Sequence, residues 1–185
     1  MDPVTAAFDA TPREWFLPPD QRERAAYDGP LPIGHGQTCS QPRTVARMLR
    51  LLDVRHGQRV LDVGSGSGWT TALLAHLVGP AGEVRGVEIV PDLVAFGRSN
   101  LAASHRRWAR IDAATPEVLG DPEHAPYDRV LVSAGATELP LPLVDQLVLH
   151  GRLVVPVQGE MLLVIADEDG PLVTTHGAYR FVPLR

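Results

Sequence analysis

The sequence predicts an α/β fold: a doubly wound, mainly parallel sheet with helices on both faces and a C-terminal antiparallel hairpin. Three observations lead to this prediction. Apolar runs typical of buried strands alternate with stretches of helical periodicity through the middle of the chain. A turn with three glycines joins one strand to the next helix within residues 60–68, VLDVGSGSG. Near the C-terminus the alternation stops, and two apolar runs flank residues 167–170, DEDG, which is a hairpin signal.

Length and composition limit the class of protein. The 185 residues suffice for one domain with a sizeable core, and 44% hydrophobic residues is ordinary for a globular chain. The net charge of −5 argues against a nucleic-acid partner, and no apolar run is long enough for a membrane span or a secretory signal. Cys39 is the only cysteine, and the histidines show no metal-ligand spacing. We therefore expect a cytoplasmic monomer that holds no metal and binds neither nucleic acid nor membranes.

The N-terminal part, residues 1–30, is rich in Pro, Arg and Asp and is expected to form an irregular arm, which Trp15 and Phe16 anchor on the domain. The glycines and prolines of residues 29–42 argue against a regular element, so we expect a constrained loop that forms a wall of the active site. Ser40 is expected to be the N-cap of the next helix, with Pro42 in its first turn.

The remaining elements follow from their periodicity. The helix after the loop has an apolar stripe formed by Val45, Met48, Leu49 and Leu52. Further helices are expected from about residue 69, over 91–104, and around Leu143, Val144, Leu147 and Val148; strands are expected at 60–63, 83–88, 107–111, 129–132, 151–157, 161–166 and 172–181. The chain then divides into an N-terminal arm with the active-site loop (1–42), a cofactor-binding core (43–157) and a C-terminal hairpin (158–185), all in one domain.

The glycine turn indicates a nucleotide-type cofactor site of a Rossmann-like domain, because its bare backbone and the following helix N-terminus face one crevice. Trp69 stands where a dinucleotide-binding turn needs a small residue, which argues against NAD. Asp62 lies two residues before Gly64 and can bind an ammonium group, which S-adenosylmethionine carries. Glu88 ends the next strand, where an acid can accept hydrogen bonds from ribose hydroxyls. We therefore predict an S-adenosylmethionine site.

Several segments then show a family resemblance. Residues 31–42, LPIGHGQTCSQP, resemble the LPIGHGQTISQP loop of the protein-L-isoaspartate O-methyltransferases, which restore isoaspartyl residues formed by ageing of Asp and Asn. The glycine turn matches the first cofactor motif of that family, which many methyltransferases share. Residues 127–132, 151–157 and 181–184 are similar to later family blocks, so the resemblance covers nearly the whole chain.

The resemblance implies a function and site residues. It implies methyl transfer from S-adenosylmethionine to the α-carboxylate of an isoaspartyl residue in a peptide or protein, leaving S-adenosylhomocysteine. Ser40 corresponds to the catalytic serine of the family. The residues implied in cofactor binding are Gln37, Thr38, Cys39, Ser40, Asp62, Gly64, Ser65, Gly66, Glu88, Ile89, Asp112 and Ala113.

The sequence also departs from the family pattern. Ile111-Asp112-Ala113 replaces a G-D-G motif that contacts adenine, and Cys39 replaces an apolar β-branched residue. Most of an N-terminal helix of longer family members is missing. Three alternatives stay open: Ser40 acts only as a helix cap; the enzyme methylates an ordinary aspartate of a ribosomal peptide to form aspartimide; or the protein binds the cofactor without catalysis.

Overall fold

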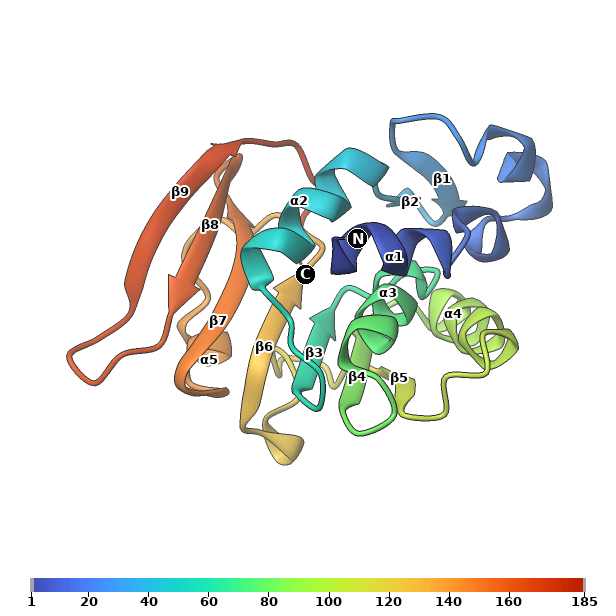
Figure 1. Cartoon of the computed structure of the whole chain (residues 1–185). Coiled ribbons are helices and arrows are strands. Elements are labelled where there is room, and N and C mark those ends of the chain that lie inside the picture. The colour runs from blue at the N-terminus through green and yellow to red at the C-terminus, as the bar shows by residue number, and fades with distance from the viewer. Residues whose placement is uncertain (1, 185) are drawn as a thin grey trace.

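The structure of the protein, a computed structural model, describes residues 2–184. Its main feature is a seven-stranded sheet with the order β5-β4-β3-β6-β7-β8-β9 (Figure 1). The strands of this sheet are β3 (Arg59–Val63), β4 (Glu83–Glu88), β5 (Ala109–Ala113), β6 (Tyr127–Val132), β7 (Leu147–Val157), β8 (Glu160–Ile165) and β9 (Leu172–Ala178). The helices are α1 (Pro3–Asp9), α2 (Pro42–Leu52), α3 (Trp69–Val78), α4 (Pro91–Ala103) and α5 (Leu141–Val144), with short 3-10 helices η1 (Arg13–Phe16), η2 (Pro19–Arg24) and η3 (Pro122–His124).

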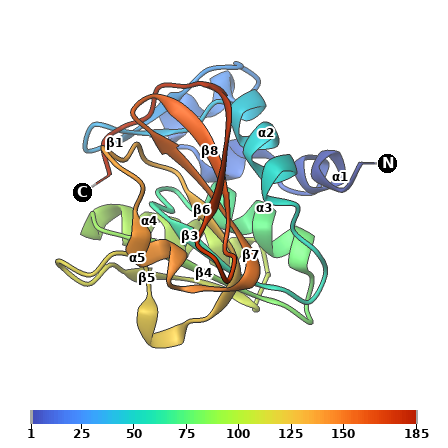
Figure 2. The same cartoon turned by 90° about the vertical axis from the view of Figure 1, so that its left-hand side faces the viewer.

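The strand directions confirm the predicted fold class. β3 lies at the centre and pairs in parallel with β4 and β6, and the parallel arrangement continues to β5 on one side and β7 on the other. β8 and β9 then pair antiparallel, so the sheet ends in the predicted hairpin. Figure 2 views the molecule from this antiparallel end.

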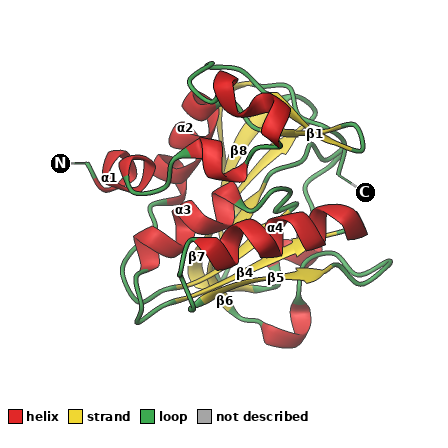
Figure 3. Cartoon of the chain, turned by 90° about the vertical axis from the view of Figure 1, so that its right-hand side faces the viewer, coloured by secondary structure: helices red, strands yellow, loops and turns green. Residues whose placement is uncertain are grey.

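The two faces of the sheet are covered unequally. Helices α1 to α4 lie on one face, and Figure 3 shows α4 lying across β4 and β5. The other face is covered by the short helix α5 and by the segment that joins β5 to β6. Both apolar faces are therefore buried, as a parallel sheet requires, but one of them is covered mostly by loops. No helix within residues 2–184 is both long and apolar enough to cross a membrane.

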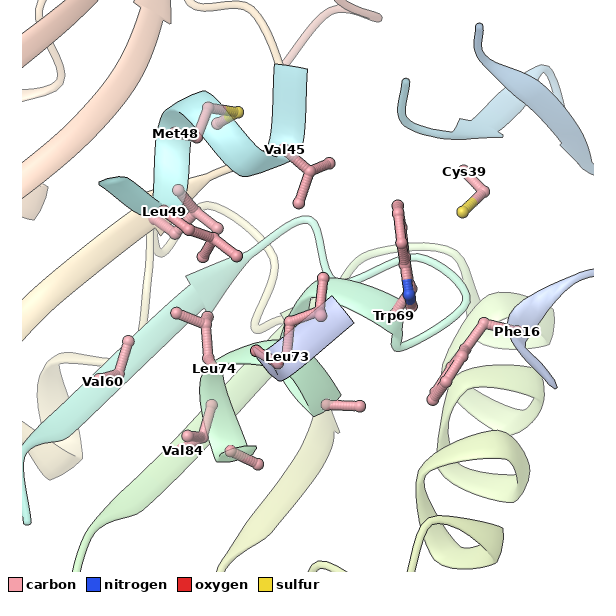
Figure 4. Packing of buried hydrophobic residues seen from close by; sticks show 14 of the residues in the cluster. Phe16, Cys39, Val45, Met48, Leu49, Val60, Trp69, Leu73, Leu74 and Val84 are labelled. Carbon is pink, nitrogen blue, oxygen red and sulfur yellow. The ribbon is translucent and has the colours of Figure 1, made fainter. Parts of the chain in front are cut away.

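The larger part of the core lies between α2, α3 and the sheet. All four predicted stripe residues of α2 are buried, and Figure 4 shows Val45 and Leu49 pointing toward Leu73 and Leu74 of α3. Phe16 is also fully buried in this cluster, as predicted, whereas Trp15 is 50% exposed. Phe16 alone of the two aromatic residues therefore anchors the N-terminal arm.

The N-terminal region is more regular than expected. Residues 3–9 form α1, where Pro3 begins the helix and the Asp2 carboxylate accepts a hydrogen bond from the Thr5 amide. The segment expected as a loop contains a hairpin of β1 (Leu31–Gly34) and β2 (Gln37–Cys39). Its turn is formed by Gly34, His35 and Gly36, all with positive φ, a backbone conformation that glycine allows without strain.

Two local predictions were wrong. α2 begins at Pro42, and its N-cap is Gln41 rather than Ser40, with no capping hydrogen bond from either side chain. Leu147 and Val148, expected in a helix with Leu143 and Val144, lie in β7 instead. The helix ends at Val144 because the chain must turn to enter the sheet, where Leu147 pairs with Tyr127 of β6.

Candidate active site

A cavity of about 380 Å³ lies at the carboxyl ends of the parallel strands, where α/β sheets hold their ligands. Several parts of the chain line it: the β1–β2 hairpin with Ser40, the glycine turn with the start of α3, the segments that follow β4, β5 and β6, and the C-terminal residues 182–184. The volume falls in the range of small-molecule sites, about 300–1,000 Å³.

The glycine turn brings the backbone to the cavity surface. Gly64, Gly66 and Gly68 all have positive φ, and Gly68 is the N-cap of α3. Close packing of this turn depends on Gly97 of α4, where a Cβ would approach the Gly66 carbonyl oxygen to 2.7 Å. In a dinucleotide-binding turn, the small residue that permits such close packing lies in the helix that follows the turn. Here a residue of another helix, Gly97, takes that role.

Trp69 follows this turn directly and contacts both the N-terminal arm and the cavity. Its ring packs at 5.3 Å edge-to-face against Phe8 of α1, and its Nε1 donates to the Thr11 carbonyl. The same residue lines the cavity. Trp69 is therefore a packing residue that also forms part of the cavity wall.

Asp62, the residue before the last of β3, is completely buried. It does not line the cavity itself, but the next residue, Val63, and its hydrogen-bond partner Thr70 do. One of its carboxylate oxygens accepts hydrogen bonds from the Thr70 and Thr71 hydroxyls at 2.8 and 2.7 Å. The other oxygen, Oδ1, is buried without a partner. Burial raises the pKa of this carboxyl to about 6, with a smaller contribution from the charge of Glu88. A buried carboxylate oxygen without a donor is suited to bind a cationic group of a ligand.

Glu88 ends β4 and lies at the wall of the cavity, where it is 6% exposed. Its two carboxylate oxygens each accept one backbone hydrogen bond, from the Gly66 and Val90 amides, both at 2.9 Å. These bonds fix the side chain between the glycine turn and the start of α4. Each carboxylate oxygen keeps lone pairs that can accept hydrogen bonds from ligand hydroxyls.

The β1–β2 hairpin supplies the opposite wall through four consecutive residues, Gln37, Thr38, Cys39 and Ser40. Ser40 is half-buried, and its hydroxyl makes no hydrogen bond to another group within residues 2–184. Cys39 is 4% exposed, and burial raises the pKa of its thiol. Cys39 is therefore a small buried side chain whose thiol stays protonated at neutral pH.

The structure corrects the expectation for the segment after β5. Neither Asp112 nor Ala113 lines the cavity. The Asp112 carboxylate instead forms ion pairs with Arg85 at 3.4 Å and Arg98 at 3.2 Å. The cavity is lined at this place by the residues that follow: Ala114, Thr115, Glu117, Val118, Leu119 and Gly120.

Other expected residues do line the cavity: Gly64, Ser65, Gly66 and Ile89. Two further groups were missed. Ser133 and Ala134 follow β6, and the rule that ligands bind at the carboxyl ends of parallel strands could have identified them. Residues 182–184 are held beside them by hydrogen bonds between Gly135 and both Val182 and Leu184. No local sequence pattern predicts that contact.

The cavity fits S-adenosylmethionine by three observations. Asp62 has an unpartnered buried oxygen for the ammonium group, Glu88 has free acceptor capacity for the ribose hydroxyls, and the turn is open at Gly64, where a Cβ would meet no atom closer than 3.9 Å. Within residues 2–184 there is no cluster of three His, Cys, Asp or Glu side chains that could hold a metal ion.

Comparison with known proteins agrees with this site. The family described as protein-L-isoaspartate(D-aspartate) O-methyltransferase matches residues 1–185. The chain is 45% identical over 187 residues to the protein-L-isoaspartate O-methyltransferase of Methanopyrus kandleri, covering 98% of this chain and 82% of the relative. It is 41% identical over 192 residues to that of Pyrococcus horikoshii, covering 98% and 84%.

A solved structure is also similar over the full chain. It belongs to a Plasmodium falciparum protein assigned as a protein-L-isoaspartate O-methyltransferase, in complex with S-adenosyl-L-homocysteine. The TM-score is 0.89 at 28% identity, and the match covers 100% of this chain and 91% of that one. The chain therefore belongs to the protein-L-isoaspartate(D-aspartate) O-methyltransferase family.

Proposed function

We propose that the protein transfers a methyl group from S-adenosylmethionine to the α-carboxylate of L-isoaspartyl residues in damaged peptides and proteins. One observation carries this proposal: the segment Gln37–Ser40 and the glycine turn face the same cavity, with Glu88 in its wall and the buried Asp62 bonded to the lining residue Thr70. The family membership and the match over nearly the whole chain support the same reaction.

The residues that we propose to hold the cofactor each bind a different chemical group of it. Asp62 neutralises the ammonium group, Glu88 accepts from the ribose hydroxyls, and the backbone at Gly64 and Gly66 allows close approach. Thr115 and the backbone near Gly120 take the place that the sequence assigned to Asp112 beside the adenine. When bound, S-adenosylmethionine supplies an electrophilic methyl group on a sulfonium centre.

The chain itself has to orient the acceptor and need not activate it. A terminal or aspartyl-type carboxyl has a pKa of about 3.3–3.9, so it is already ionised at neutral pH. No general base is therefore required. Ser40 lines the cavity with its hydroxyl free to donate, which supports a role in hydrogen-bonding the carboxylate and fixing its direction. Alignment of two reactants can lower a barrier by about 7–11 kcal/mol in favourable cases.

Repair of the isoaspartyl residue follows from the reactivity of the methyl ester that the transfer produces. The nitrogen of the adjacent backbone amide can attack the methyl ester carbonyl and expel methanol, which forms a succinimide without the enzyme. Hydrolysis of that ring by water gives some normal aspartate. The chain thus needs only to recognise the isoaspartyl carboxylate and release the ester.

The test uses labelled S-adenosylmethionine and one peptide in two forms, isoaspartyl and normal aspartyl. Base-labile label on the isoaspartyl form alone is the expected result. Label on the normal aspartyl form would favour aspartimide formation, and label on neither, with S-adenosylhomocysteine binding demonstrated separately, would overturn the proposed activity.

The oligomeric state and the cellular location of the protein stay predictions. We propose that the enzyme acts in the cytoplasm, on the basis of its composition and the single cysteine, and that it acts as a monomer. Light scattering of the purified protein, and fractionation of cells that express it, test the two parts separately.

A further inference from the structure

The side chain of Arg13, in η1, is a buried cation bound to backbone carbonyls. Arg13 is 6% exposed, and within residues 2–184 no carboxylate forms an ion pair with it. Its Nη1 donates to the carbonyls of Ala25 and Tyr27, and its Nη2 donates to those of Gly29, Cys39 and Ser40, with distances from 2.8 to 3.4 Å. A buried charge needs this many acceptors, because burial without them is costly.

Two of these acceptors belong to the wall of the cavity. The Cys39 and Ser40 carbonyls lie 2.8 and 2.9 Å from the same nitrogen, Nη2. Together they fix the peptide planes on both sides of the Ser40 α-carbon. Ser40 lies after β2 and before the N-cap of α2, so neither element holds it. Its hydroxyl also has no hydrogen bond of its own, so the direction of the side chain depends on the backbone that Arg13 holds.

Arg13 also connects this wall to the cofactor side. Its guanidinium carbon lies 5.4 Å from the centre of the Trp69 ring, in a cation–π contact. Trp69 begins α3 directly after the glycine turn and lines the cavity. Arg13 therefore contacts the wall that carries Ser40 and the residue that follows the cofactor turn.

We propose that Arg13 is a positioning residue for methyl transfer, which sets the direction of the Ser40 hydroxyl through the carbonyls of residues 39 and 40. The proposal rests on the proposed function, and it assigns to Arg13 no contact with substrate or cofactor. A lysine at this position keeps the charge but cannot reproduce the planar set of donors that reaches five carbonyls.

The experiment compares Arg13→Lys with Arg22→Lys, which changes an exposed arginine of the same arm that donates to a single carbonyl, that of Leu17. Turnover of an isoaspartyl peptide is divided by the number of S-adenosylhomocysteine sites measured by calorimetry, so that unfolded protein does not count. We expect Arg13→Lys to lower kcat per site on the order of 10- to 100-fold, and its affinity for S-adenosylhomocysteine to change less than about threefold. Arg22→Lys should match the wild type.

A double-mutant cycle separates positioning from a general structural role. In a Ser40→Ala background, Arg13→Lys should lower kcat per site by less than about twofold, because the group that Arg13 orients is absent. The same loss in both backgrounds would overturn the proposal, as would an unchanged kcat for Arg13→Lys.

A variant that fails to fold and a wild type that fails to react lead to different conclusions. If Arg13→Lys binds no S-adenosylhomocysteine, Arg13→Gln takes its place in the cycle, and loss of binding by both would overturn the proposal by assigning Arg13 to the fold. If the wild type itself transfers no methyl to the peptide, the proposed function fails and this inference falls with it. Wild-type turnover together with unaffected variants overturns the inference alone.

Discussion

At the scale of single residues, removal of the Ser40 hydroxyl should affect catalysis and leave the stability of the fold almost unchanged. Because Gln41 is the helix N-cap and the Ser40 hydroxyl has no partner within residues 2–184, its removal costs the fold little, within about 0.5 kcal/mol. Ser40 lines the cavity, and we propose that its hydroxyl orients the substrate carboxylate. We expect Ser40→Ala to lower kcat/KM for the isoaspartyl peptide on the order of 10-fold or more, while S-adenosylhomocysteine binding stays near the wild-type value.

The matched control for Ser40→Ala is Ser99→Ala, at an exposed position of α4. It should leave activity, binding and the free energy of unfolding unchanged. An equal fall of thermal stability, binding and turnover in Ser40→Ala would show that the serine supports the structure and does not orient the substrate.

Asp62 gives cofactor binding a predictable pH dependence. Burial raises the pKa of its carboxyl from an ordinary value of about 3.9 to about 6, so the folded protein favours the protonated form, and the stability from this group is lost as the pH rises through about 6. An ammonium group beside Oδ1 favours the ionised form instead. Binding of S-adenosylhomocysteine should therefore release a proton near pH 6, and the affinity should rise about tenfold between pH 5 and pH 7.

Calorimetry in two buffers of different ionisation enthalpy measures that proton release. Asp62→Asn keeps acceptors for Thr70 and Thr71 but carries no charge, so it should bind more weakly and lose the pH dependence below pH 7. The same pH dependence in wild type and Asp62→Asn would assign the titration to another group.

At the scale of elements, a cluster of charges replaces a helix on the second face of the sheet. Arg85 of β4 donates to Asp121 at 2.6 Å, and Asp121 also accepts from the Tyr127 hydroxyl and contacts the His124 ring. Burial raises the pKa of the Asp121 carboxyl, but these contacts together hold it below its ordinary value. The cluster thus fixes the irregular segment between β5 and β6, whose residues line the cavity.

We expect Asp121→Asn to lower the free energy of unfolding by about 3 kcal/mol at pH 7, because Arg85 is left buried without its closest counter-charge. Since the pKa of Asp121 is lowered on folding, this difference should shrink as the pH falls below about 4. Denaturant unfolding at several pH values measures it, with the exposed Asp145→Asn as control. A difference that stays constant as the pH falls from 4 toward 2 would contradict the assignment.

The helices and strands also show how much of the secondary structure can be predicted from the sequence. Long periodic segments were predicted within a few residues, because a buried stripe such as that of α2 constrains many positions together. Leu147 and Val148 were placed in a helix because a short apolar run fits both periods. The hairpin turn at His35 was missed, although a residue between two glycines is a turn signal.

The site was predictable where chemistry and spacing coincide in one segment. That Glu88 and residues 37–40 line the cavity could be inferred because strand ends and glycine turns fix them locally. The role of Asp62 in cofactor binding stays a prediction, since Asp62 itself does not line the cavity. Asp112 was misplaced because the sequence does not show that Arg85 and Arg98 bind its carboxylate outside the cavity. Contacts of residues 182–184 and of Arg13 join distant parts of the chain, and no local pattern encodes such contacts.

At the scale of the whole molecule, the cavity joins parts of the chain that are far apart in sequence. The β1–β2 hairpin comes from the N-terminal region, the glycine turn from the central strand, and residues 182–184 from the C-terminal tail. The tail residues are held by hydrogen bonds to Gly135, which follows β6. A ligand in this cavity therefore contacts segments that the sheet alone does not hold together.

Ligand binding should consequently stabilise all three segments together. S-adenosylhomocysteine at 100 times its Kd adds about 2.7 kcal/mol to the free energy of unfolding, which for a chain of this size raises Tm by about 5–10 °C. Hydrogen exchange with and without the ligand should show slower exchange in residues 31–40, 63–70 and 179–184, and no change at the β8–β9 turn, which lies outside the cavity. Slower exchange in the glycine turn alone would show that the hairpin and the tail close the cavity without contacting the cofactor, so that their role would be limited to the peptide substrate.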